Sequence, residues 1–112
     1  KVAGIMGNDP KLLGEVVSAG RRVGEEFCEL PLVEDYKEHI KGNIAELLNI
    51  SNVRSEAGPI MGGLFLREFV GAVPWVHLDI AGTAFWSGDG PYGPKGGTGS
   101  PVRTLLEWLG AL

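Results

Sequence analysis

The feature that most constrains the fold is an apolar run followed directly by a capped amphipathic helix. Residues 2–6, VAGIM, are small or apolar throughout, which is typical of a buried strand. Asn8 or Asp9 can then cap a helix whose first turn accommodates Pro10. Apolar residues recur at helical spacing as far as Phe27, so we expect a helix of roughly five turns, weakened by glycines. A strand followed by a helix is typical of an α/β layer.

The rest of the chain predicts shorter elements of the same two kinds. The expected elements are a short helix in 33–42, a loop in 43–56 with one possible helical turn at 44–48, a buried helix that starts at Pro59 and carries an apolar stripe to Phe69, a strand at 75–80, and a helix with Ser100 as its cap, Pro101 in its first position and Gly110 at its end. Ala57, Gly58, Gly62 and Gly63 would allow close backbone approach at the buried helix. We therefore expect an α/β fold, a partial αβα layer of two or three strands with about four helices.

The composition excludes several classes of protein. The formal net charge is −4 without a basic cluster, which argues against nucleic acid and anionic membrane as partners. There is no apolar run long enough to span a bilayer. Cys28 is the only cysteine, so an intramolecular disulfide is impossible and a reducing, cytoplasmic setting is expected. Without an activating neighbour in sequence, Cys28 is expected to be a buried structural thiol.

A histidine and an aspartate near a strand end suggest a metal site. His77 and Asp79 stand two apart on the predicted strand 75–80, so their side chains share one face. A metal site needs three or four ligands, and His39 is the only other histidine. The alternative is that Asp79 accepts hydrogen bonds from amides of the following loop, and we favour it. The adjacent acidic pairs Glu25-Glu26 and Glu34-Asp35 are expected to be solvated.

A glycine-dense segment follows that strand, within a chain that holds 18 glycines in 112 residues. Gly88, Gly90 and Gly93 formally match G-x-G-x-x-G, but Pro91 and Pro94 intervene before the next helix. The segment 95–100, KGGTGS, directly precedes a helix and could bind an anion, although it lacks the ending of a P-loop. We favour a loop whose backbone passes close to a substrate or a neighbouring subunit over nucleotide binding.

The order of four sequence blocks resembles the C-terminal end of the leucyl (cytosol) aminopeptidases. The blocks are LPLVEDYKEHIKGNIAELLNI, RSEAGPIMGGLFLREFV, PWVHLDIAGTAF and YGPKGGTGSPVRTLLEWL, and the preceding GNDPKLLGEVVSAGRRVGEEFCELPL also fits that family. The resemblance covers essentially the whole chain. The chain begins at Lys1 inside an apolar stretch, so we expect a segment of a larger zinc-exopeptidase-like catalytic domain, with residues 1–112 as a single unit.

The resemblance implies a specific division of labour. The family enzymes release N-terminal amino acids from peptides with two divalent cations, zinc or manganese, that activate a water molecule. Their metal ligands come from a lysine-and-aspartate segment and an N-T-D-A-E-G-R-L motif, and neither is present here. No metal ligand or catalytic residue is therefore expected in this chain, which alone should be inactive. Ala81, Gly82 and Ala84 fall where the family lines the pocket for the first side chain of the peptide.

The resemblance also implies partners. The peptide substrate, the remainder of the catalytic domain and identical subunits, in a hexamer, are the partners expected for the intact enzyme. The role of the Gly88–Gly93 loop stays open, because it is longer and richer in glycine than the family leads us to expect. The alternative is a free-standing domain of the same ancestry that binds a ligand or partner without catalysis.

Overall fold

The computed structural model describes residues 2–52, 56–90 and 93–110. Lys1, residues 53–55 of the predicted loop, Pro91 and Tyr92 of the glycine segment, and residues 111–112 lie outside the described residues. The secondary-structure elements are β1 (Ala3–Gly7), α1 (Pro10–Arg22), β2 (Phe27–Glu29), the 3-10 helix η1 (Glu34–Ile40), α2 (Gly58–Arg67), β3 (Val76–Asp79), β4 (Phe85–Trp86), β5 (Gly96–Gly97) and α3 (Val102–Trp108). None of the helices in these ranges is long and apolar enough to cross a membrane.

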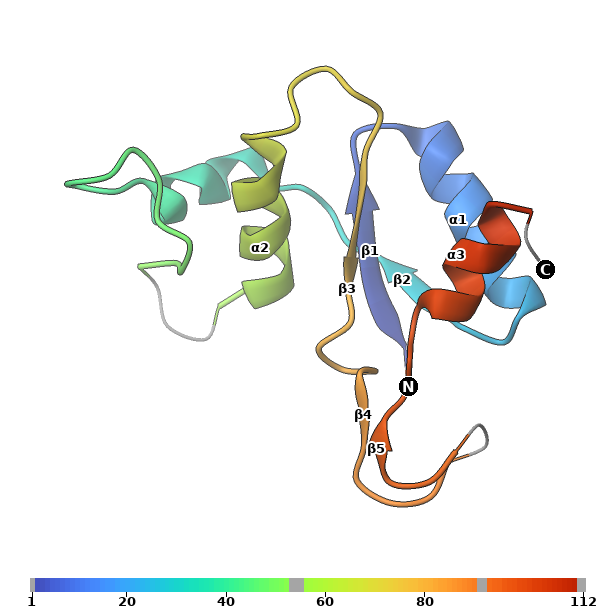
Figure 1. The fold of residues 1–112 in the computed structure, drawn as a ribbon. Helices are drawn as coiled ribbons and strands as arrows, with labels where there is room; N and C mark the ends of the chain where they lie inside the picture. The colour runs from blue at the N-terminus through green and yellow to red at the C-terminus, as the bar shows by residue number, and fades with distance from the viewer. Residues whose placement is uncertain (1, 53–55, 91–92, 111–112) are drawn as a thin grey trace.

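A mixed sheet forms the middle layer, with strand order β2–β1–β3. Strand β1 runs parallel to β2 and antiparallel to β3, with Ile5 opposite Glu29 on one side and Leu78 on the other. Helices α1 and α3 lie on one side of this sheet, and α2 with η1 lies on the other (Figure 1). The predicted α/β class and its αβα layering are therefore confirmed.

Consecutive residues of β1 fill two different cores, because side chains alternate across a strand. Ile5 is fully buried and packs with Leu13 and Val16 of α1. Met6 is also fully buried and faces α2, where a Cβ added at Gly63 would collide with its sulfur. The predicted close approach at this buried helix is thus confirmed at Gly63.

Helix α1 is shorter than the predicted five turns. Asp9 caps its start as expected, since its Oδ1 accepts a hydrogen bond from the backbone N of Leu12 at 2.8 Å. Its end is set by Gly24, whose φ of +74° is a left-handed conformation that favours glycine. The N–H of the next residue, Glu25, then bonds back to the carbonyl of Gly20 at 2.9 Å, which closes the last turn. Phe27 consequently belongs to β2 and not to the helix.

Three predictions about burial are wrong. Helix α2 ends at Arg67, so Phe69, the residue expected at the end of its buried apolar stripe, lies beyond the helix and is 70% exposed. Cys28 is exposed, because the three-residue strand β2 turns it away from the core. Glu25 is buried with 7% of its surface exposed, since the turn that ends α1 directs it beneath α3. Its neighbour Glu26 is exposed, as predicted.

Charged side chains tie η1 to α2 on the other side of the sheet. Lys37 Nζ lies 2.6 Å from Glu68 Oε1, and Arg67 Nη1 lies 2.6 Å from Glu34 Oε1. The hydrogen bond from Arg67 lowers the pKa of Glu34 below its ordinary value. Glu34 is solvent-exposed, as predicted, and it is also the ion-pair partner of Arg67.

Candidate functional site

The loop that follows β3 presents small side chains at the surface. The carbonyl of Ile80 accepts hydrogen bonds from the N–H groups of Thr83 and Ala84, at 2.9 and 2.8 Å. This turn leaves Ala81 and Gly82 exposed and Ala84 partly buried. A Cβ added at Gly82 would meet only one backbone oxygen, at 3.8 Å. The three residues singled out in the sequence thus lie together on one tight turn with free space beside it.

His77 and Asp79 have structural roles in the described part of the chain. Asp79 Oδ1 accepts a hydrogen bond from the N–H of Ala81 at 3.2 Å, which confirms that this carboxylate serves the loop. His77 stacks on Trp75 with ring centroids 6.1 Å apart. Burial lowers the pKa of His77, and the Asp79 carboxylate partly opposes that effect. Across residues 2–52, 56–90 and 93–110, no three His, Cys, Asp or Glu residues converge as a metal site would require.

The glycine segment forms a two-stranded arm, defined here as residues 85–90 and 93–97. Phe85 pairs with Gly97 and Trp86 pairs with Gly96, in antiparallel fashion. The arm projects away from the layered body (Figure 1). At Gly90 a Cβ would lie 2.6 Å from the indole ring of Trp86, so this position requires glycine. The chain passes from β5, the second strand of the arm, into a turn, so the glycines of the arm do not open a helix as those of a dinucleotide-binding loop do.

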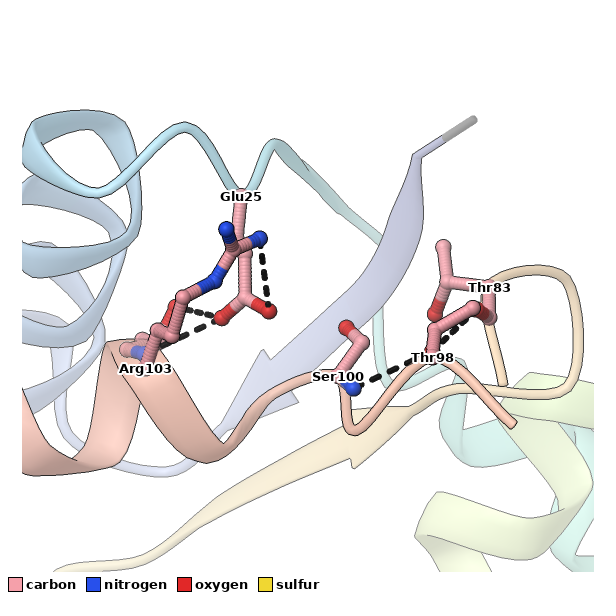
Figure 2. Close-up of polar contacts among 6 residues, drawn as sticks. Glu25, Thr83, Thr98, Ser100 and Arg103 are labelled. Atoms are coloured by element: carbon pink, nitrogen blue, oxygen red, sulfur yellow. Dashed lines mark hydrogen bonds and ion pairs between the residues drawn. The ribbon is translucent and has the colours of Figure 1, made fainter. Parts of the chain in front are cut away.

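The hydroxyl group of Thr98 is both a donor and an acceptor of hydrogen bonds at the base of the arm (Figure 2). Its Oγ1 donates to the carbonyl of Thr83 at 2.8 Å and accepts from the N–H of Ser100 at 3.1 Å. Its own backbone N–H donates to the carbonyl of Ala84 at 2.9 Å. One side chain therefore connects the turn after β3 to the segment that enters α3. We call this set of three bonds the Thr98 clasp.

Helix α3 is capped by a residue that is distant in sequence (Figure 2). Pro101 occupies the position before the helix and no side chain of the connecting segment caps it, so the prediction that Ser100 caps this helix is wrong. Instead, Glu25 Oε2 accepts from the backbone N and the hydroxyl of Thr104, at 3.0 and 2.6 Å. Arg103 Nη2 lies 3.5 Å from the other oxygen of Glu25. The predicted helix end is confirmed, because Gly110 follows α3 with a φ of +72°.

Sequence reasoning missed both Thr98 and Glu25. Thr98 carries the only side chain with a hydrogen-bonding group between Gly96 and Gly99, which is a weak signal for a tie to a neighbouring segment. Gly24 signalled that α1 could end before Glu25. Nothing in the local sequence connects Glu25 with Thr104, which lies 79 positions later.

Comparison with known sequences identifies the family. The profile of the cytosol aminopeptidase family, catalytic domain, matches residues 1–106. The chain belongs to the cytosol aminopeptidase family. It is 46% identical over 110 residues to a probable cytosol aminopeptidase of Geobacter sulfurreducens, covering 98% of this chain and 22% of that protein. A Clostridium perfringens relative of the same description is 46% identical over 106 residues, with coverage of 95% and 21%.

Solved structures of related proteins share the fold. The bottromycin maturation enzyme BotP in complex with Mn superposes with a TM-score of 0.85 at 40% identity, covering 96% of this chain and 24% of that one. A mutant of tomato leucine aminopeptidase superposes with a TM-score of 0.83 at 37% identity, with coverage of 96% and 20%. The chain thus spans about a fifth to a quarter of the length of the relatives it matches.

Proposed function

We propose that this chain is the pocket-wall segment of a metal-dependent cytosol aminopeptidase that releases N-terminal amino acids from peptides in the cytoplasm. The observation that carries the proposal is the turn after β3. It holds Ala81, Gly82 and Ala84 together, exposes the first two, and is fixed by main-chain bonds to Ile80. A pocket that must admit a substrate side chain needs small side chains on a rigid backbone.

The two divalent cations, zinc or manganese, are proposed to bind to residues outside this chain. The manganese in the BotP structure supports divalent metal for the intact enzyme. In the described residues no three His, Cys, Asp or Glu side chains come together, so that part of the chain does not fit a metal. When bound, the ions would polarise the peptide carbonyl and supply a hydroxide nucleophile. The residues of this chain would orient the first side chain of the peptide and exclude water from it.

The test measures whether the turn controls selectivity in the intact enzyme. Ala84→Leu should take volume from the pocket without changing the metal content. Loss of room for one or two methylene groups changes discrimination by roughly 10–200-fold in kcat/KM. We therefore expect release of leucine or phenylalanine to fall by such a factor, while release of alanine or glycine is spared.

The matched control is Ala72→Leu, because Ala72 is exposed in the loop before β3 and away from the turn. This variant should behave as the wild type on both classes of substrate. Equal losses on leucyl and alanyl substrates in Ala84→Leu would make Ala84 a core residue and refute the pocket.

A second experiment tests whether the metal ligands lie outside this chain. The chain by itself should not hydrolyse amino-acid anilides, and chelator-sensitive hydrolysis by it would refute that assignment. If the intact protein has no peptidase activity with either zinc or manganese, the result would favour the alternative, a free-standing domain that binds a ligand or partner without catalysis.

A further inference from the structure

The Thr98 clasp joins the proposed pocket wall to the segment that enters α3. We propose that Thr98 is a positioning residue that sets side-chain selectivity through the turn at 80–84, an inference that rests on the proposed function. The hydroxyl of Thr98 acts through the carbonyl of Thr83, and the backbone N–H of Thr98 donates to the carbonyl of Ala84.

The other hydrogen bonds described for this turn join its donors to Asp79 and Ile80, including one from the hydroxyl of Thr83 to the carbonyl of Ile80 at 3.3 Å. Asp79 and Ile80 bond to its N–H groups, at 3.2 Å to Ala81 and at 2.9 and 2.8 Å to Thr83 and Ala84. Those bonds hold the donors of the turn and leave its carbonyl groups to be fixed from elsewhere. The Thr98 side chain takes the carbonyl of Thr83, and its backbone N–H takes the carbonyl of Ala84. The turn is therefore held between β3 and the segment that enters α3.

The same segment is anchored at its far end by the buried carboxylate of Glu25. Its bonds to Thr104 fix the first turn of α3, four residues beyond Ser100. Ser100 in turn donates its N–H to Thr98 Oγ1 at 3.1 Å. The Glu25 bonds and the Thr98 clasp are thus two separate groups of hydrogen bonds, joined through the chain from Ser100 to Thr104, and Figure 2 shows them on either side of β1. The Thr98 clasp provides the link that lies next to the wall.

Thr98→Val in the complete, metal-loaded enzyme removes the link with little change in side-chain shape. The variant loses both bonds of the hydroxyl and keeps the main-chain bond from position 98 to Ala84. A wall displaced by a fraction of an ångström should discriminate less well between large and small side chains. We expect the ratio of kcat/KM for leucyl and alanyl substrates to fall about tenfold. Thr98→Ser keeps a hydroxyl on the same Cβ and should restore most of the ratio.

Glu25→Gln controls for general loosening, because it weakens the anchor of α3 and leaves the Thr98 clasp in place. It should lower the midpoint of urea unfolding and leave the leucyl-to-alanyl ratio unchanged. If Glu25→Gln changes this ratio as much as Thr98→Val, or if serine fails to rescue it, Thr98 is merely structural and the inference is overturned.

Ala84→Leu, measured in parallel, separates failure of the inference from failure of the proposed function. If Ala84→Leu changes the ratio and Thr98→Val does not, the pocket stands and the role of Thr98 falls. If neither variant changes it, the pocket assignment falls and the inference falls with it.

Discussion

Replacement of Glu25 by alanine should destabilise the protein far more than a surface substitution does. Glu25 is 7% exposed and Thr104 is fully buried, so alanine leaves the N–H and hydroxyl of Thr104 without their acceptor and without ready access to water. An unsatisfied buried polar group costs about 1–3 kcal/mol. Removal of a negative charge from the start of a helix adds about 0.3–1 kcal/mol. We therefore expect a loss of about 2–5 kcal/mol in the free energy of unfolding.

Urea unfolding followed by far-UV circular dichroism measures this loss, and hydrogen exchange in Val102–Trp108 localises it to α3. Glu26→Ala is the matched control, since Glu26 is the exposed neighbour and should change stability by less than about 0.5 kcal/mol. The double variant Glu25→Ala with Thr104→Val should lose less than the sum of the two single losses, by about 0.5–3 kcal/mol. Additive losses, or a single loss equal to that of Glu26→Ala, would show that the carboxylate does not cap α3.

Two further predictions concern the opposite side of the sheet. Gly63→Ala should be less stable than Gly62→Ala by about 1–3 kcal/mol in urea unfolding. A methyl group at 63 collides with the buried Met6, whereas one at 62 meets nothing closer than 3.9 Å. Equal stabilities would contradict the packing described for α2. Burial lowers the pKa of His77 below its ordinary value of 6.5, so the unfolded chain takes up that proton more readily and stability should fall as the pH drops below about 6.5. His77→Gln should weaken this fall while His39→Gln keeps it, and identical stability profiles from pH 5 to 8 for the two variants would refute the assignment.

The sequence predicted those elements whose signals are local. The apolar run of β1, the Asp9 cap of α1, and the strand at 76–79 each depend on neighbours within a few residues, and the structure confirms them. The close approach at Gly63 could be expected because glycines interrupt an apolar helix. Local physical preferences were sufficient at these positions because tertiary contacts agree with them.

The parts that were missed depend on contacts between distant segments. Strand β2 has three residues, and its parallel pairing to β1 is what makes it a strand. Glu25 looked like half of a solvated acidic pair, and only the position of α3 shows that it is a buried cap. The small residues at 81, 82 and 84 were found through the family resemblance. The Thr98 clasp that holds their turn could not be predicted from the sequence, because its partners lie before and after the arm.

The two-stranded arm is joined to the body by ends that Thr98 holds side by side. A segment whose two ends are tied together transmits little of its own motion to the residues beyond the tie. Changes of length or composition near its exposed residues, such as Ser87 to Asp89, alter mainly the arm itself. The sequence of the arm can therefore vary independently of the neighbouring turn, because the hydroxyl group of Thr98 separates the two.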